Sequence, residues 1–375
     1  MRCLVVLVLA GAAAAGPLTE SRFGEAKTKL LRKRGGSAST EKAVAAALGW
    51  LVAHQTTDGY WDADGFNTEC DCKGKGGGWH GGRVPCRFDF EVTGLATLAL
   101  LGAGHSPEKG EHKEAVARAL DWLQARGRGG TLFGTSFATQ AFAEAYDMTG
   151  SKELRDAAER GVAVLLESQL PDGGWRYFVG MSTSGTPTTT AVVTALEVAR
   201  DAGIEVDREY GAEVLKLLDK LTKRDNGRVA YTLTGHLQGY TPTTTNAASA
   251  LVCRTYLGAS SRDPRVQESL GALARRRPKW SVKFKTMKVK GVERRVQIGY
   301  LQHYYWHHGT EALVRIGGGA WSAWNGKLKK ALLSKQQKTG HAKGSWDPAG
   351  TYGPVGGRVF STALCAMMLE AYYRY

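Results

Sequence analysis

The sequence predicts an all-α protein, an (α/α)6 toroid of two concentric helix layers. Two kinds of helical stretch alternate six times along the chain: one kind is amphipathic, and the other is apolar on every face. A helix without a polar face has to be covered on all sides, so the six apolar helices are placed in the inner layer. A linear solenoid is the alternative, but it needs polar repeats at both ends. The last stretch, 359–375, is as apolar as the others.

Each apolar stretch surrounds a threonine that is followed by small and apolar residues, and five of the six end at glycine, which takes the left-handed C-cap conformation at little cost. These threonines are Thr93, Thr139, Thr190, Thr245, Thr310 and Thr362. The amphipathic helices are expected at 39–55, 112–126, 152–169, 208–223, 264–276 and 321–337, where apolar residues recur at helical spacing.

Residues 1–15 have the features of a signal peptide. Arg2 provides a positive start, residues 4–10 form a short apolar core, and Ala13 and Ala15 form an A-x-A cleavage site before Gly16. An ordinary apolar N-terminal helix is the alternative. We therefore expect an exported protein, periplasmic or secreted, with no transmembrane helix in the mature chain. Residues 16–37 are expected to be a basic, flexible segment, and 38–375 a single toroid domain.

Several joints between helices share a pattern of glutamine, glycine and tryptophan. The first copy, W-L-x3-Q-x3-G-x-W, spans 50–61, the second spans 160–175, and the third, with Gln337 and three extra residues, spans 333–346. This pattern resembles the Gln-Trp repeat of the squalene cyclases and of protein prenyltransferase β-subunits. The resemblance covers nearly the whole predicted mature chain, and segment 169–177 is similar to an exported bacterial branch of these terpenoid cyclase-type toroids. It implies that each Gln caps a helix end and each Trp stacks over it.

The catalytic motifs of the family do not occur in this sequence. The cyclases protonate an alkene with an Asp-x-Asp-Asp acid, and the nearest string here is 62–64, Asp-Ala-Asp. Prenyltransferases hold zinc with Asp, Cys and His, yet neither Cys253 nor Cys365 has an aspartate two residues before it, and both are expected as core residues. The resemblance therefore implies the fold, leaves open whether the protein is an enzyme, and identifies no cofactor or metal.

Titratable side chains gather on the fifth apolar helix. His303, His307 and Glu311 are four residues apart and share a face, which suits acid–base catalysis or an open metal site. Aromatic and histidine neighbours suggest a ligand-binding wall. These neighbours are Tyr300, Tyr304, Trp306 and His308. A purely structural aromatic wall with hydrogen-bonded histidines is the alternative.

Asp89 and Glu91 begin the first apolar helix. Negative charge at this position stabilises the helix dipole, so capping is one interpretation. The other is that the two acids face the mouth of a central cavity, as acids do in the related cyclases.

A glycine-rich loop carries Cys70, Cys72, His80 and Cys86. Export favours a disulfide between Cys86 and one of the other two cysteines. A Cys3His zinc site and free thiols are the alternatives.

The strongest charge concentration lies between residues 275 and 295, with ten basic residues against Glu293 alone, in a chain of net charge +15. Four lysines nearly alternate with apolar residues, which predicts a β-hairpin insertion near 280–298 that turns at Lys290-Gly291. They are Lys283, Lys285, Lys288 and Lys290. An anionic surface of the cell envelope is the expected partner, and nucleic acid is disfavoured by export. A merely soluble insertion is the alternative.

Three functions remain compatible with these residues. The first is binding of an elongated apolar, isoprenoid-like molecule in the centre, with cyclisation or isomerisation as its chemistry if it is an enzyme. The second is a non-catalytic scaffold for a protein or an anionic envelope polymer, and the third a glycan hydrolase or lyase. A deep apolar cavity favours the first, a centre filled by side chains the second, and an open groove with paired carboxylates the third.

Overall fold

The computed structural model describes residues 16–63, 65, 88–127, 130–233, 242–281, 284–289, 292–297, 302–350 and 353–375. The loop cysteines, His80, Lys283, Lys290 and Tyr300 lie outside these residues. Cys253 and Cys365 are buried free thiols in the core, as expected. No helix in the described part of the chain is both long and apolar enough to span a membrane.

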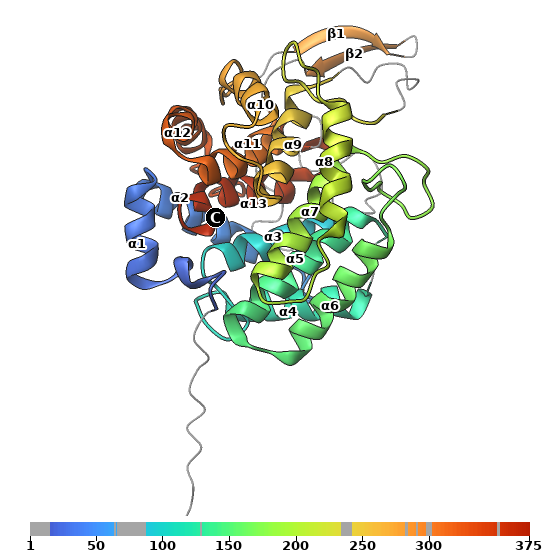
Figure 1. The fold of residues 1–375 in the computed structure, drawn as a ribbon. Helices are drawn as coiled ribbons and strands as arrows, with labels where there is room; N and C mark the ends of the chain where they lie inside the picture. Colours follow the sequence, from blue (N-terminus) through green and yellow to red (C-terminus); the bar gives the residue numbers. More distant parts are fainter. Residues whose placement is uncertain are drawn as a thin grey trace, which may run out of the picture.

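Six helices form a closed inner ring (Figure 1). They are α3 (Asp89–Gly102), α5 (Leu132–Thr149), α7 (Thr186–Asp201), α9 (Thr244–Tyr256), α11 (His303–Ile316) and α13 (Gly353–Arg374). Each contacts the next, and α13 contacts α3, so the ring closes on itself. The α/α toroid predicted from the sequence is confirmed, and the linear solenoid is excluded. Within α13 the chain kinks at Gly357, whose φ of 65° requires glycine.

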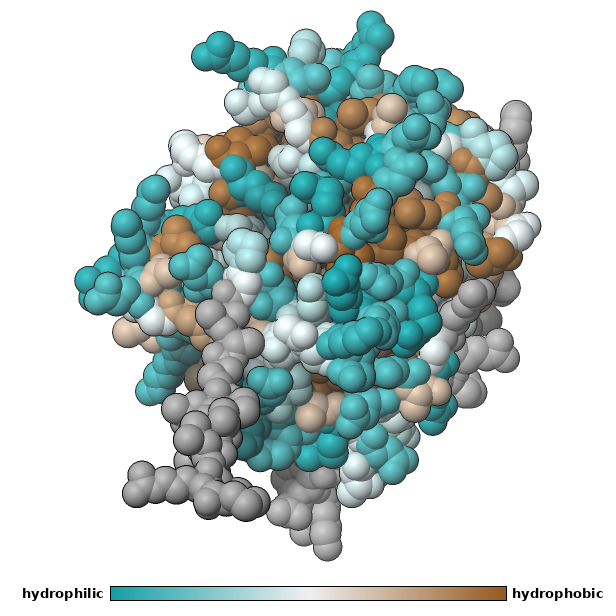
Figure 2. All heavy atoms as spheres, turned by 60° about the horizontal axis from the view of Figure 1, so that its bottom comes forward, coloured by the Kyte–Doolittle hydropathy of each residue, from teal (hydrophilic) through white to brown (hydrophobic). Residues whose placement is uncertain are grey.

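Six amphipathic helices surround the ring. They are α2 (Ala38–Ala53), α4 (Lys113–Arg126), α6 (Lys152–Glu167), α8 (Glu209–Leu221), α10 (Pro264–Ala274) and α12 (Gly318–Lys335). In α8, for example, Tyr210, Val214 and Leu217 are buried while charged residues face water. This arrangement gives an outer surface that is mostly hydrophilic, with hydrophobic residues gathered in patches (Figure 2). The predicted ranges of these helices agree with the structure to within three residues.

The Gln-Trp joints bind the outer helices to each other and to the inner ring. In the joint after α6, Trp175 donates its indole N–H to the Leu165 carbonyl (2.6 Å), and its backbone N–H to the Thr189 hydroxyl of α7 (3.1 Å). The Gln169 amide donates to Gly173 and to the Tyr210 carbonyl of α8. The joints after α2 and α12 repeat these contacts through Gln55 with Trp61, and Gln336 with Trp346.

The third copy of the pattern was assigned to the wrong glutamine. Gln336, which is buried, donates to Ala43 and Gly344, whereas the Gln337 side chain donates to Asp347 at the surface. In all three joints the glutamine lies four residues after the leucine whose carbonyl accepts the tryptophan indole N–H, and for Leu332 that residue is Gln336. The segment between Gln336 and Gly344 is longer than in the other joints, so counting back from the tryptophan does not identify the glutamine.

A glycine with positive φ fixes each joint, because a Cβ at that position would lie too close to the next outer helix. At Gly173 (φ 93°) a Cβ would be 2.6 Å from the Glu213 carbonyl oxygen. Gly59 and Gly344 are placed in the same way. Gly227 (φ 67°), after α8, would bring a Cβ to 2.0 Å from the Glu268 oxygen of α10. This fourth joint has buried Val229 two residues later instead of tryptophan, so a search for Gln and Trp could not find it.

The N-terminal segment, expected to be flexible, is packed on the toroid. It contains a short 3-10 helix, η1 (Glu20–Arg22), and α1 (Gly24–Lys33), which contacts α13 (Figure 1). Thr19 and Arg22 are buried and hydrogen-bond to Asp147 and Glu144 of α5. These buried polar contacts and the packing of α1 offset the entropy cost of ordering the segment. The basic composition of the segment gives no sign of these contacts.

The basic insertion forms the predicted hairpin. Strands β1 (Phe284–Val289) and β2 (Val292–Gln297) pair antiparallel, with Val289 opposite Val292, while residues 290–291 lie outside the described residues (Figure 1). Lys285 lies opposite Val296, and Lys288 opposite Glu293. Binding of an anionic surface by this hairpin stays a prediction.

We expect Trp175→Ala to lower the free energy of unfolding by ~3–5 kcal/mol, because it removes a large, fully buried side chain and the bond to Leu165. Urea denaturation followed by circular dichroism measures this. Phe178→Ala is the control, since the Phe178 side chain is 58% exposed and its loss should stay within about 0.5 kcal/mol. A change below about 1 kcal/mol for Trp175→Ala would show that the joint does not hold the ring together.

Candidate functional site

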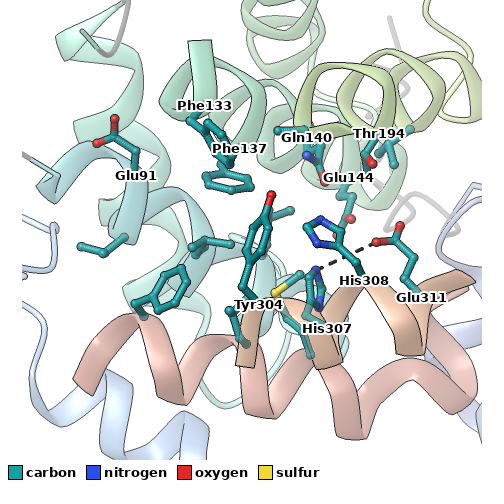
Figure 3. Close-up of a pocket in the computed structure, with 18 of the residues that line it drawn as sticks. Glu91, Phe133, Phe137, Gln140, Glu144, Thr194, Tyr304, His307, His308 and Glu311 are labelled. Atoms are coloured by element: carbon teal, nitrogen blue, oxygen red, sulfur yellow. Dashed lines mark ion pairs between the residues drawn. The ribbon is translucent and has the colours of Figure 1, made fainter. Parts of the chain in front are cut away.

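The inner ring surrounds a cavity of about 420 Å³ (Figure 3). Apolar and aromatic residues from all six inner helices form most of its wall, with α9 contributing its last residue, Tyr256. Among them are Val92, Leu95, Phe133, Phe137, Ala191, Val198, Leu364 and Met367. A volume of this size lies within the range of small-molecule sites.

The two ends of the cavity differ because the inner helices all begin at one end and finish at the other. Partly exposed aromatic residues from the helix starts surround the first end, the mouth. These are Phe88, Phe133, Phe137 and Phe360, with Phe178 from the loop before α7. The opposite end, the floor, is formed by the last turns of the helices together with Leu18 and Arg22 from the N-terminal segment.

Charged groups on the floor are paired with each other. Both oxygens of buried Glu144 accept hydrogen bonds, from Arg22 (2.6 Å) and from Arg374 (2.8 Å). The two guanidinium groups also donate to the Leu101 and Leu98 carbonyls at the end of α3. Since the C-terminal end of a helix carries partial negative charge, arginine is favoured at this end of the ring.

Helix α11 contributes a polar wall near the floor. Figure 3 shows His307, His308 and Glu311 directed toward the space that Gln140, Glu144 and Thr194 face from the other side. Glu311 Oε1 accepts a hydrogen bond from the Tyr256 hydroxyl (2.9 Å), and Glu311 Oε2 lies 4.0 Å from His307 Nε2.

Burial sets the protonation of this wall. Desolvation raises the pKa of Glu311, and the nearby Arg315 and the Tyr256 hydrogen bond only partly oppose it. Desolvation lowers the pKa of His307 well below its usual value, and that of His308 to about 3. The imidazoles are therefore neutral near pH 7, and the 4.0 Å contact between His307 and Glu311 is weak as an ion pair.

Glu91 lies near the mouth, on α3. Its Oε1 accepts a hydrogen bond from the Thr131 hydroxyl, and its Oε2 has no hydrogen-bond partner within the described residues. Burial raises the pKa of this carboxyl despite the bond from Thr131. The cavity thus has, toward each end, a carboxyl group whose pKa is raised by burial.

The structure brings five of the predicted site residues into the cavity. They are Glu91, Tyr304, His307, His308 and Glu311. Asp89 lies outside it, in the first turn of α3, and its Oδ1 accepts a hydrogen bond from the Ala63 backbone N–H (3.0 Å). His303, expected on the same face as His307, instead packs against Trp280 and Trp306 in the core. Trp306 is fully buried and also lies outside the cavity.

Sequence reasoning missed the residues that other helices contribute. Gln140 and Glu144 are two polar residues four apart in the largely buried α5, a signal that could have been recognised. Arg22 and Arg374 reach the floor from the two ends of the chain, so no local pattern indicates that they meet at Glu144. Among the described residues, no group of histidines, cysteines and acids is arranged to hold a metal ion.

No family model and no curated protein matches the sequence. Solved structures do match. An inactive variant of the α-1,6-mannanase GH76A of Salegentibacter sp. HEL1_6 is 10% identical, with a TM-score of 0.62 over 89% of this chain and 99% of that chain. The type II terpene cyclase MstE from Scytonema is 13% identical, with a TM-score of 0.56 over 89% and 98%. At such identities the similarity establishes the α/α toroid fold, and the activity has to be argued from the site.

We expect His303→Phe to reduce the acid sensitivity of the protein without changing ligand binding. Burial lowers the pKa of His303 to about 4, so between pH 6.5 and 4 the unfolded chain binds a proton at this position that the folded chain does not. Stability therefore falls as pH falls through this range, by up to about 1.4 kcal/mol per pH unit for one group. Urea denaturation at pH 7 and pH 5 should show a smaller difference for the variant. An unchanged difference would contradict a neutral buried His303.

Proposed function

We propose that this is an exported toroid protein that binds an elongated apolar molecule, isoprenoid-like in character, in its central cavity. The observation that carries this proposal is the lining: a deep cavity of about 420 Å³ with aromatic and aliphatic walls. Each methylene group that enters such a cavity contributes about 0.8 kcal/mol. The exposed Phe178 and its aromatic neighbours at the mouth would meet such a ligand as it enters.

The groups in the wall suit proton donation to a double bond. A carboxyl group favoured in its neutral form, such as Glu311, is an acid that can protonate an alkene, and the positive charge that forms would face the rings of Tyr304 and Phe137. Acid-initiated cyclisation or isomerisation is therefore the reaction class we propose. The MstE cyclase was solved with geranylgeranyl dihydroxybenzoate as substrate, which is an elongated apolar molecule of this kind.

A glycan hydrolase is the second candidate, because the mannanase has the higher TM-score and was solved with α-1,6-mannotriose. Three glutamates line the cavity: Glu91, Glu144 and Glu311. Two features favour the apolar ligand over this candidate. The inactive mannanase carries substitutions of two consecutive aspartates, and this sequence contains no two consecutive aspartates. Both oxygens of Glu144 are also held by arginine.

We expect geranylgeraniol to bind and mannotriose not to bind, as measured by native mass spectrometry and by titration calorimetry. Ala191→Phe places a ring in the cavity and should weaken geranylgeraniol binding at least about tenfold, because the space is then filled. Ala45→Phe, at an exposed position of α2, is the matched control and should bind as the unmodified protein does. Binding of mannotriose, abolished by Ala191→Phe, would favour the glycan candidate.

We expect Glu311→Gln to abolish turnover of a linear polyprene while retaining its binding, since the amide keeps the shape and loses the proton to be donated. A loss of about 10²-fold or more in turnover is the scale for removal of a general acid. Product analysis by gas chromatography–mass spectrometry measures this, with Glu209→Gln on the exposed face of α8 as the control. Full turnover by Glu311→Gln would remove Glu311 as the acid and leave Glu91.

A further inference from the structure

Gly16, the residue that follows the predicted cleavage site, contacts the C-terminal end of α5. Its backbone N–H donates to the Asp147 carbonyl oxygen at 2.7 Å. Three residues later, both the N–H and the hydroxyl of Thr19 donate to Asp147 Oδ2, at 2.8 and 2.6 Å. The segment is therefore attached to Asp147 at two points before it reaches the cavity floor.

A side chain at residue 16 would have to displace the Asp147 carboxylate. A Cβ at this position would lie 2.1 Å from Asp147 Oδ1 and 2.7 Å from Asp147 Cγ, well below any normal contact. The carboxylate thus lies directly against the Gly16 backbone. Because Oδ2 takes both bonds from Thr19, Oδ1 is the oxygen that faces Gly16.

Asp147 needs a cation that the described residues do not provide. Its side chain is buried, and it lies in the last turn of α5, where the helix dipole disfavours negative charge. Glu144, one turn earlier, is paired with two arginines. For Asp147 no ion pair occurs within the described part of the chain. A positive charge at Gly16 would neutralise the carboxylate and also meet the carbonyl end of α5 favourably.

We propose that cleavage between Ala15 and Gly16 turns the Gly16 nitrogen into an ammonium group that pairs with Asp147, and that this ion pair locks residues 16–22 in place as the floor of the cavity. A signal-peptidase-type enzyme, which selects small residues such as Ala13 and Ala15, adds water across the amide bond. Ala15 leaves with the new carboxylate, and the Gly16 amine takes up a proton at neutral pH.

Maturation then completes the cavity. Leu18 and Arg22 line it, and Arg22 is one of the two partners of Glu144. In the uncleaved chain the Gly16 nitrogen is an amide with a single N–H, which the Asp147 carbonyl already accepts. Only the free ammonium has further N–H groups and a charge for the carboxylate. This inference does not depend on which ligand the cavity binds.

The test compares chains that begin at Gly16 with chains that retain Ala15, each prepared with Asp147 and with Asp147→Asn. Retaining Ala15 should raise the unfolding equilibrium constant about tenfold, the scale for a charge in a partly buried site at a helix end. The same extension should have little effect in Asp147→Asn, which keeps the acceptors for Thr19 but loses the charge. Asp121→Asn, exposed on α4, is the matched control and should leave the full effect of the extension. Equal stability of the two starts, or an undiminished loss in Asp147→Asn, would overturn the proposal.

A second measurement does not depend on the folding of any Asp147 variant. In the chain that begins at Gly16, the amine should react with acetic anhydride at least about tenfold more slowly than in the chain that retains Ala15, because a paired amine reacts only after the segment opens. Equal rates would overturn the proposal. So would N-terminal sequencing that finds the exported protein beginning at a residue other than Gly16.

Discussion

An inner helix that is apolar on every face cannot leave any face in water, and this constraint determines the rest of the structure. Each of the six inner helices is covered by its two neighbours in the ring and by amphipathic helices outside. The one face that no helix covers points to the centre of the ring, where the walls enclose the cavity. The cavity is therefore apolar for the same reason that the ring closes.

The glycines of the joints allow the outer helices to pack closely around this inner ring. At Gly59, Gly173, Gly227 and Gly344 the chain passes so close to a carbonyl oxygen of the next outer helix that no side chain fits. Tryptophan and glutamine stabilise three of these joints, and Val229 occupies the tryptophan position in the fourth. The close approach of backbone to backbone is common to all four, so it is the geometric requirement, and the buried tryptophans with their indole hydrogen bonds add stability to it.

The sequence predicts the layers well because they depend on periodic burial, which each helix displays by itself. The outer helices agree to within three residues, and the two strands of the hairpin form where the alternation of lysines indicates. The failures share another cause. The contact between His303 and Trp280 places His303 in the core, outside the cavity. The hydrogen bonds to Asp147 and Glu144 hold the N-terminal segment on the toroid. These contacts join residues far apart in the chain, and no local period indicates them.

The part of the candidate site that lies on α11 could be predicted from the sequence for the same reason. Tyr304, His307, His308 and Glu311 lie on one helix, so their spacing could be read directly. The opposite wall and the floor come from α5, α7, the N-terminal segment and the last residues of α13. Only the closed ring brings them together, because a toroid places residues from every part of the chain around one axis.

Desolvation shifts the pKa values of both the carboxyl and the imidazole groups that line the cavity. It raises the pKa of Glu91 and Glu311 and lowers that of His307 and His308, so the neutral form is favoured in every case. On the floor, Arg22 and Arg374 both pair with Glu144 and donate to carbonyl groups at the end of α3. The wall facing the centre therefore combines histidines with lowered pKa values and carboxyl groups with raised ones, while the ionic groups are paired with one another at one end. Burial alone thus accounts both for the apolar lining of the cavity and for the shifted pKa values of the titratable groups within it.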